Sequence, residues 1–288
     1  MLVRLSKEND ALRIDPQFKL KPGLSYEVAI AEQTFIITMG DTQAPTPRLT
    51  SIAPSQSVLP SNTLRLYLHF SQPMARGQLR QNVNLQTALG EPVDAPFLSL
   101  DTELWNPTQT RATLLLDPGR IKQGVGPNTT GGAPLEVGRT YRLSISSQMQ
   151  SAAGVPLSSE AAVSFRVGPP ERRKLEPRNW EIERPHVGSF APLSIAFDRI
   201  MDRGTVLRLV TLLGPDGAHI GGQRTTDGGG WSLVPNQPWR PGRYSLMIHP
   251  ALEDIAGNTI DAPFDAKPGT IGQKSAPVVL TLDIAGNK

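Results

Sequence analysis

The sequence predicts an all-β fold made of repeated β-sandwich units. A turn that ends in glycine is followed three times by the same alternating pentad, which begins at Tyr26, Tyr141 and Tyr244. Alternation with period two is typical of strands that have one buried face. The chain also has 27 prolines and 26 glycines and lacks a long amphipathic helical stretch. This abundance of turn residues favours short strands joined by turns.

The last two repeats agree in spacing over most of their length. Steps of 4, 7, 20 and 23 residues, taken from Phe70 and from Phe197, reach the same or similar residues: Met74, Gly77, Gly90 and Val93, and Met201, Gly204, Gly217 and Ile220. We therefore expect two complete sandwiches, at residues 44–169 and 170–288. Proline-rich segments at 41–47 and 168–177 are the predicted linkers. A strand at 277–284 either closes the last domain or pairs elsewhere.

Residues 1–43 carry only the second half of a repeat, with expected strands at 2–5, 11–14, 26–30 and 34–38. A half sandwich leaves one apolar sheet face uncovered, which costs about 25 cal/mol for each Å² left in water. We therefore expect that residues upstream of Met1 complete this partial unit, or that it packs on a neighbouring domain or on another chain.

The middle repeat is longer than the last one in two places. It has 28 residues between Gly90 and Pro118, where the last repeat has 18, and 20 residues between Pro118 and Gly138, where the last repeat has 7. Surplus residues in a β-scaffold lie in surface loops, which often carry binding sites. A specific site is therefore expected in these two insertions.

Five residues of the insertions are candidate binding residues. Trp105 lies beside Glu103 and Asn106, and an exposed indole next to a carboxylate and an amide suits sugar stacking or a protein hot spot. The alternative is that Trp105 anchors its own loop on the sandwich. Arg120 and Lys122 follow a turn and could form a small anion-binding edge, or they are solvated charges.

Composition excludes several classes of function. A net charge of +3 without a basic block argues against a nucleic-acid partner, although the pI is about 9.3. Zero cysteines exclude disulfides, cysteine metal sites and thiol nucleophiles. No apolar run reaches transmembrane length, and residues 1–30 lack a signal-peptide pattern. Hydrolase, metalloprotease and phosphate-loop motifs are missing. We expect no membrane insertion, no cofactor, no metal and no catalytic residues.

Three motifs together resemble the bacterial Ig-like domain of the S-layer-protein (SbsA) type. A strand ends in Phe70-Ser-Gln-Pro-Met74, and a turn of the form Leu-x-Pro-Gly-x-x-Tyr precedes each pentad, most clearly at Leu20-Lys-Pro-Gly-Leu-Ser-Tyr26. The motif Asp-x-Ala-Gly-Asn closes the last repeat at residues 254–258, whereas Ser151-Ala-Ala-Gly-Val155 replaces it in the middle repeat. The likeness covers most of residues 45–265. We expect each tyrosine hydroxyl to reach a backbone carbonyl, and the Asp and Asn to serve as turn residues.

The resemblance implies tandem Ig-like sandwiches in an exported protein, located in the periplasm, on the cell surface or in the medium. The expected function is that of a non-enzymatic spacer or adhesion scaffold in a bacterial envelope or secreted protein. One alternative is a module that recognises a carbohydrate or protein partner through the middle-domain insertions. Another is an accessory domain of an enzyme.

Overall fold

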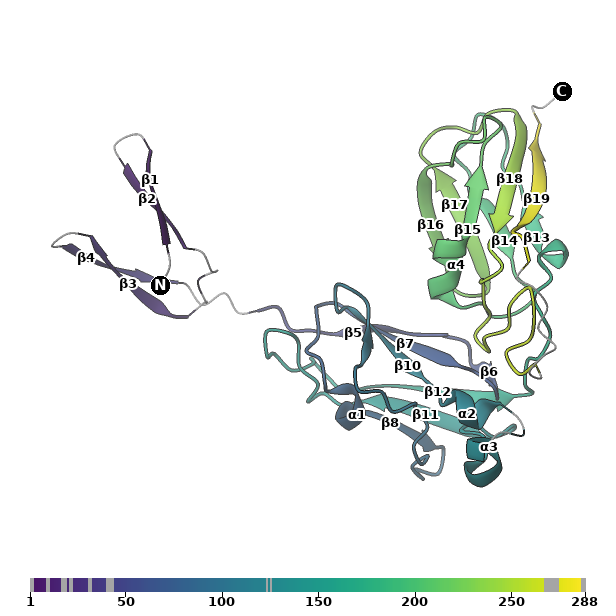
Figure 1. Cartoon of the computed structure of the whole chain (residues 1–288), viewed down its shortest axis with the longest axis horizontal. Coiled ribbons are helices and arrows are strands. Elements are labelled where there is room, and N and C mark those ends of the chain that lie inside the picture. The colour runs from purple at the N-terminus through teal and green to yellow at the C-terminus, as the bar shows by residue number, and fades with distance from the viewer. Residues whose placement is uncertain are drawn as a thin grey trace. The chain divides into compact units, whose positions relative to one another are not determined.

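The chain divides into two compact units in a computed structural model, Met1–Pro45 and Thr46–Lys288 (Figure 1). The structure describes residues 3–8, 11–16, 20, 23–30, 33–39, 44–122, 124, 126–266 and 275–285. Residues 41–43 of the first predicted linker lie outside this part of the chain. Each compact unit is described by itself.

The first unit contains two antiparallel hairpins. β1 (Val3–Glu8) pairs with β2 (Ala11–Pro16), and β3 (Ser25–Ile30) pairs with β4 (Gln33–Thr38). These are the strands that the alternating pattern predicts. All six side chains of β4 are exposed. The packing of this partial unit on a neighbouring domain or chain stays a prediction.

The middle sandwich, which we define as residues 46–168, consists of two four-stranded sheets. The first sheet has the strand order β5 (Leu49–Ala53), β7 (Arg65–Phe70), β10 (Arg111–Leu115) and β9 (Leu104–Trp105). The second has the order β6 (Val58–Pro60), β12 (Ala161–Gly168), β11 (Thr140–Ile145) and β8 (Val83–Thr87). With β6 set aside, this is the arrangement of immunoglobulin constant-type domains: β5, β7, β10 and β9 are strands A, B, E and D, and β8, β11 and β12 are strands C, F and G.

The second sandwich, which we define as residues 175–285, repeats this arrangement, with no counterpart of β6 among its described residues. Its first sheet has the order β13 (Glu181–Glu183), β14 (Leu193–Ala196), β17 (Gly230–Pro235) and β16 (Gly222–Thr226). Its second sheet has the order β15 (Val210–Leu213), β18 (Gly242–Ile248) and β19 (Val278–Ile284). The strand predicted at 277–284 is therefore β19, and it closes the last domain. The all-β, Ig-like fold class is confirmed.

Each sandwich has its own hydrophobic core, built by the inward-facing residues of both sheets. Leu66 and Leu68 of β7 are buried in the first core, and Leu193 and Ile195 of β14 occupy the matching positions in the second. The predicted boundary between residues 169 and 170 lies inside the second compact unit and stays a prediction.

Helices are short and lie at the ends of strands: α1 (Leu79–Asn82), α2 (Pro118–Ile121), α3 (Gly126–Gly131), α4 (Arg203–Leu209) and the 3₁₀ helix Pro177–Asn179. Within the described residues, no helix has the length and apolar character needed to cross a membrane.

The tyrosine near the start of strand F, Tyr141 in β11 and Tyr244 in β18, is buried in both sandwiches. The Tyr244 hydroxyl donates to the Arg240 carbonyl oxygen (2.9 Å), as expected for this corner. The Tyr141 hydroxyl differs from the expectation, because it accepts a hydrogen bond from the Glu136 amide (3.0 Å). The corner is therefore kept in both copies with different bonding.

Candidate functional site

Trp105 lies on the edge strand β9 and packs against the core of the middle sandwich. Its ring centroid is 5.8 Å from that of Phe70, and its indole Nε1 donates to Glu103 Oε2 (2.7 Å). The side chain is half-buried. Trp105 thus anchors its own loop, which was one of the two sequence alternatives, and its role in binding stays a prediction.

The polar neighbours of Trp105 are occupied by local hydrogen bonds. Glu103 also accepts from the amides of Gly77 (2.8 Å) and Leu79 (2.7 Å), which satisfies donors at the start of α1. Asn106 Oδ1 accepts from the amides of Thr110 and Arg111, both at 2.9 Å. These side chains hold the insertion in place, so a sugar or protein ligand would have to compete with the loop itself.

Arg120 of α2 ties the two insertions together. Its guanidinium donates to the carbonyl oxygens of Asp94 (2.6 Å) and Ala95 (3.1 Å) in the first insertion, and of Gly131 (3.0 Å) and Gly132 (2.9 Å) in the second. An arginine with four carbonyl acceptors has few donor directions left for an anion. The predicted anion-binding role of Arg120 stays a prediction, and its observed contacts are structural.

Lys122 reaches the second sandwich. Its Nζ lies 4.7 Å from the centroid of the Phe264 ring, within the range of a cation–π contact. The five candidate residues therefore do not meet in one site: three anchor the first insertion, Arg120 joins the insertions, and Lys122 contacts the neighbouring sandwich.

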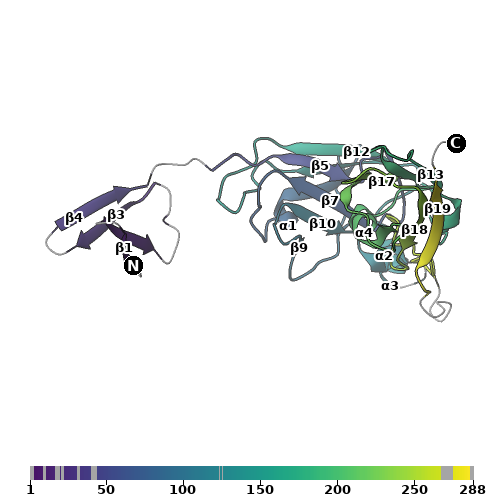
Figure 2. The same cartoon turned by 90° about the horizontal axis from the view of Figure 1, so that it is seen from above.

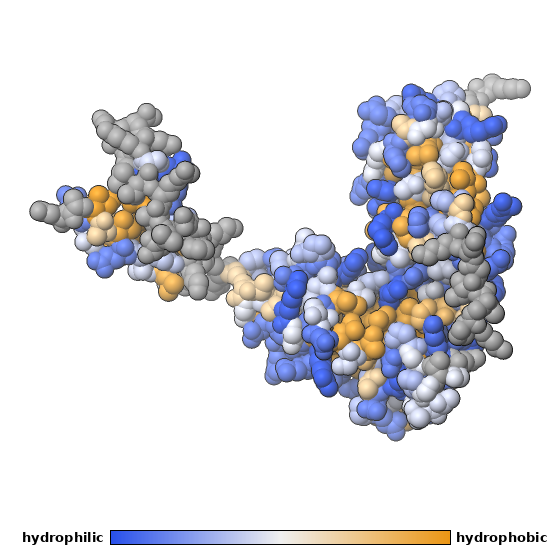
Figure 3. Space-filling view, viewed as in Figure 1, coloured by the Kyte–Doolittle hydropathy of each residue, from blue (hydrophilic) through white to orange (hydrophobic). Residues whose placement is uncertain are grey.

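The first insertion interrupts the edge strand of its sheet and borders an apolar groove of about 490 Å³. β9 pairs with only two residues of β10, Ala112 and Thr113. Leu98 then donates its amide to Leu115 (2.7 Å), and residues 99–103 loop outward between these contacts. Leu100 and Leu104 line the groove and are 44% and 42% exposed. Figure 3 shows hydrophobic side chains gathered on the surface of the middle sandwich.

A second cluster, which the sequence did not predict, lies where the two sandwiches meet. Arg65 and Tyr67 of β7 face away from their own core and contact the second sandwich. Tyr67 donates its hydroxyl to Asp202, Arg65 forms an ion pair with Glu253, and Arg65 Nη1 is 3.7 Å from Asp202 Oδ2. Burial and the adjacent Asp202 carboxylate raise the pKa of the Tyr67 phenol. We call these four residues the polar junction.

His69, two residues after Tyr67, lies on the same face of β7 and is half-buried. Burial lowers the pKa of its imidazole, and the positive charges of Arg203 and Arg111 act in the same direction. His69 is therefore not fully solvated, and the second sandwich contributes Arg203 to its surroundings.

Apolar residues of the second sandwich extend the core of the middle one. Ile255 is 4% exposed and belongs to that core, and Ile200 and Phe264 pack against it. The Leu64 amide donates to the Ile255 carbonyl oxygen at 2.7 Å. Gly257 adopts φ +79°, and a Cβ there would lie 2.9 Å from Leu64 Cδ2, so this close approach requires glycine. The sandwiches thus share a continuous apolar contact.

The linker between the sandwiches is held from both sides. Asn62 of the middle sandwich accepts from the Glu171 amide (2.9 Å) and donates to the Glu171 carbonyl oxygen. Asn258 of the second sandwich donates to the same oxygen (3.0 Å). Asn62 and Asn258 are 5% and 0% exposed. The backbone of the linker is therefore fixed at Glu171 by hydrogen bonds to both sandwiches.

Asp254 organises the turn that supplies Ile255. Its Oδ1 accepts from the amides of Ala256 and Asn258, both at 2.9 Å. Burial raises the pKa of this carboxyl to about 6, against the opposing effect of these hydrogen bonds and of Arg199. The middle sandwich makes the same turn with Ser151, whose hydroxyl accepts from the Val155 amide (3.2 Å). The expected turn role of the Asp-x-Ala-Gly-Asn motif is confirmed.

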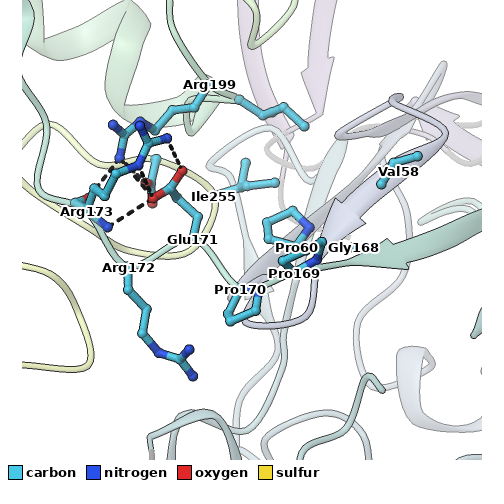
Figure 4. A pocket seen from close by; sticks show the side chains of 12 residues that line it. Val58, Pro60, Gly168, Pro169, Pro170, Glu171, Arg172, Arg173, Arg199 and Ile255 are labelled. Atoms are coloured by element: carbon cyan, nitrogen blue, oxygen red, sulfur yellow. Dashed lines mark hydrogen bonds and ion pairs between the residues drawn. The ribbon is translucent and has the colours of Figure 1, made fainter. Parts of the chain in front are cut away.

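A pocket of about 590 Å³ lies beside the linker, and three of its charged side chains, Glu171, Arg173 and Arg199, pair with one another (Figure 4). Arg173 and Arg199 both point toward the Glu171 carboxylate, at 2.6 and 3.4 Å. Hydrogen bonds and charge from these arginines, chiefly Arg173, lower the pKa of Glu171 to about 2. Prolines, isoleucines and Val58 form the rest of the lining, which contains no serine, threonine, histidine, lysine or tyrosine. Of the side chains that usually act as bases or nucleophiles, the lining therefore holds only the carboxylates of Glu171 and Asp254.

A metal-binding group of three or more His, Cys, Asp or Glu residues is absent from the described part of the chain. The turn aspartates that could have suggested calcium are used locally: Asp227 Oδ1 accepts from the amides of Gly229 and Gly230, both at 2.9 Å. Asp216 pairs with Arg240 (2.8 Å).

Comparison with known proteins gives no family. No family model and no curated protein matches the chain. The S-layer protein rSbsC(31-844) is similar at 13% identity and TM-score 0.29, over 71% of this chain and 24% of that chain. Native alpha-2-macroglobulin from Escherichia coli, spanning domains MG0-NIE-MG1, is similar at 11% identity and TM-score 0.28, over 71% of this chain and 66% of that chain. The titin domains z1z2 in complex with telethonin are similar at 15% identity and TM-score 0.23, over 86% of this chain and 100% of that chain. At these identities and TM-scores, none of the three proteins indicates a function for this chain.

Proposed function

We propose that residues 46–288 form a non-enzymatic structural module whose two Ig-like sandwiches act as one rigid pair, serving as a spacer or adhesion scaffold of a bacterial envelope or secreted protein. One observation carries the proposal: Ile255 of the second sandwich is buried in the core of the middle one. The envelope or secreted location is supported by the sequence resemblance alone.

Rigidity follows from the kinds of contact at the junction. The polar junction joins three charged groups and a phenol, the Glu171 backbone is bonded by both sandwiches, and Ile255 removes apolar surface from water. Domains joined only by a flexible linker move freely, whereas a shared apolar contact with satisfied polar groups opposes that motion. A spacer that transmits position or force needs such a fixed joint.

The distance between two spin labels tests the proposal. The chain has no cysteine, so Leu89→Cys and Val234→Cys place one label on an exposed site of each sandwich. We expect one narrow distance distribution for the native junction and a broad one when Ile255→Ala and Tyr67→Phe are added. Leu252→Ala is the control, because Leu252 is buried in the second core only. A broad distribution with the native junction would contradict the proposal.

A second candidate function is recognition of a partner protein through the apolar groove of the first insertion. The half-exposed Leu100 and Leu104 favour it, because leucines are rarely grouped at a surface depression without a use. The occupant proposed is an extended segment with aliphatic side chains. This candidate replaces the predicted contacts of Trp105, Glu103 and Asn106, whose polar atoms bond within the loop.

Selection from a random peptide library tests this second function. We expect enrichment of aliphatic peptides that bind the native chain and lose binding after Leu104→Asp. Leu89→Asp is the matched control, because Leu89 is 86% exposed and does not line the groove. Enriched peptides that bind both variants equally would contradict recognition through the apolar groove. The third alternative, an accessory domain of an enzyme, stays a prediction.

A further inference from the structure

β19 has one edge without a partner among the described residues. It pairs with β18 on one side only, from Val278 opposite Ile248 to Ile284 opposite Gly242. In the middle sandwich, the equivalent strand β12 pairs with β11 on one side and with β6 on the other. Figures 1 and 2 show β19, in yellow, at the outside of the second sandwich.

The strand register shows which backbone groups of β19 face outward. The His249 amide donates to the Leu209 carbonyl oxygen (3.0 Å), so the odd-numbered residues of β18 bond toward β15 and the even-numbered ones toward β19. Leu246 is opposite Leu280, and the even-numbered residues of β19 therefore bond to β18. The outward N–H and C=O groups of β19 belong to its odd-numbered residues: Val279, Thr281 and Asp283.

The middle sandwich, where the outer strand is present, follows the same pattern. Its register places the outward backbone groups of β12 on the even-numbered residues. There the Arg166 amide donates to the Ser57 carbonyl oxygen (2.8 Å), and the Ser61 amide donates to the Gly168 carbonyl oxygen (3.1 Å). The β19 edge is thus a row of backbone donors and acceptors of the kind that β12 shares with β6.

β19 also lacks most of the devices that keep sheet edges from pairing. Edge strands are usually short, bulged, or interrupted by lysine or proline. β19 has seven residues in continuous register and contains neither lysine nor proline. Val279 is 51% exposed beside the edge. Its one charge, Asp283, pairs with Arg243 at 3.4 Å.

We propose that β19 is a self-association edge, on which β19 of a second copy of this chain adds in antiparallel orientation across a twofold axis at Thr281. The three outward residues are symmetric about Thr281. In this register Thr281 is opposite the partner copy's own Thr281, and Val279 is opposite Asp283, so all outward N–H and C=O groups are bonded. A register centred on Asp283 would oppose two carboxylates and bond fewer groups. The two sheets join into one, a closed arrangement that stops at a dimer.

Oxidative cross-linking tests the partner and the register together. The chain has no cysteine, and opposite residues of a hydrogen-bonded antiparallel pair lie about 5.5 Å apart at Cα, which a disulfide can span. We expect Thr281→Cys to form a covalent dimer. Val279→Cys and Asp283→Cys should each stay monomeric, whereas the variant carrying both should cross-link. Ser164→Cys, at the equivalent position of β12, is the control, and cross-linking of it to the same extent would overturn the proposal.

Sedimentation velocity over a range of concentrations gives an independent readout. The native chain, 31.2 kDa as a monomer, should sediment faster as its concentration rises. Thr281→Pro removes one outward N–H and should stay monomeric, whereas Ser164→Pro makes the same change in β12 and should behave like the native chain. Circular dichroism checks that both proline variants fold, and the cysteine variants decide the question if one does not. A native chain that stays monomeric at every concentration would overturn the proposal.

Discussion

The two sandwiches have the same strand order but complete the edge beside strand E differently. In the second sandwich, β16 pairs with β17 over five consecutive residues. In the middle sandwich, the corresponding edge is split into β9 and the contact made by Leu98, with residues 99–103 between them. The second sandwich has the single residue Arg224 at this place. Four of the ten surplus residues of the first insertion therefore interrupt a strand, beside the groove.

The two sandwiches also differ in which strand carries the tryptophan next to this edge. In the second sandwich, Trp231 of β17 is opposite Thr226 of β16; in the middle one, Ala112 of β10 is opposite Trp105 of β9. The indole comes from the inner strand in one copy and from the edge strand in the other. The sandwich needs an aromatic ring near this cross-strand pair, and either strand can supply it. Trp105 is best explained as part of that exchange.

The largest effect is expected from removing these two indoles. Trp231 is 2% exposed, so Trp231→Ala should lower the free energy of unfolding by about 3–5 kcal/mol. Trp105→Ala should cost less, because that side chain is only partly buried. Urea denaturation followed by circular dichroism measures both changes.

An exchange variant sharpens this comparison. Ala112→Trp alone should destabilise the middle sandwich by about 1–3 kcal/mol through overpacking. Combined with Trp105→Thr, it copies the pair of the second sandwich and should recover part of the loss. If the two substitutions simply add, the two sandwiches do not exchange the ring in the way inferred from the register.

The second largest effect concerns the turns that close the F–G loops, where the second sandwich has Asp254 and the middle one has Ser151. The folded pKa of Asp254, about 6, lies above its ordinary value of 3.8. Between these values the folded chain binds more protons than the unfolded chain. The stability contributed by Asp254 is therefore fully present below about pH 4 and falls by about 3 kcal/mol as the pH rises to about 6.

Asp254→Asn should remove this dependence, because the amide keeps an acceptor oxygen for the Ala256 and Asn258 amides but does not titrate. The measurement is the difference in unfolding free energy between the native chain and the variant at several values between pH 3.5 and 7. Asp101→Asn, at an exposed site, serves as control. A difference that stays constant with pH would show that burial does not govern the Asp254 carboxyl.

Sequence patterns predicted most of the fold because the repeats show their period directly. Alternation placed the strands, and the Tyr pentads located strand F in both sandwiches. The spacings from Gly90 and Gly217 predicted that Pro118 matches Pro235, whereas the strand register aligns Leu116 with Pro235. The two alignments differ because two of the surplus residues lie between β10 and α2.

The junction could not be predicted because its residues look like the polar outer face of a strand. Alternation with the buried Leu66 and Leu68 places Arg65, Tyr67 and His69 on the outer face of β7, and only the second sandwich makes that face an interface. A signal was present in the comparison of copies. The outward positions of β14 hold the small residues Ser194 and Ala196, so bulky side chains at the matching positions of β7 indicated a contact.

The smallest effect is expected at the tyrosine corners, where the copies differ by one hydrogen bond. The Tyr244 hydroxyl donates to the Arg240 carbonyl oxygen and can also accept from the Arg240 amide (3.2 Å), whereas the Tyr141 hydroxyl accepts from the Glu136 amide. Both rings are 2% exposed, so tyrosine-to-phenylalanine changes keep the packing and remove only the hydroxyl. Tyr141→Phe should cost about 1 kcal/mol, and Tyr244→Phe about 1–2 kcal/mol, because it leaves the Arg240 carbonyl oxygen, in a part-buried hydrogen bond, without its donor. Urea denaturation of the two variants side by side makes the comparison, and a larger loss for Tyr141→Phe would show that the Glu136 bond is the more important one.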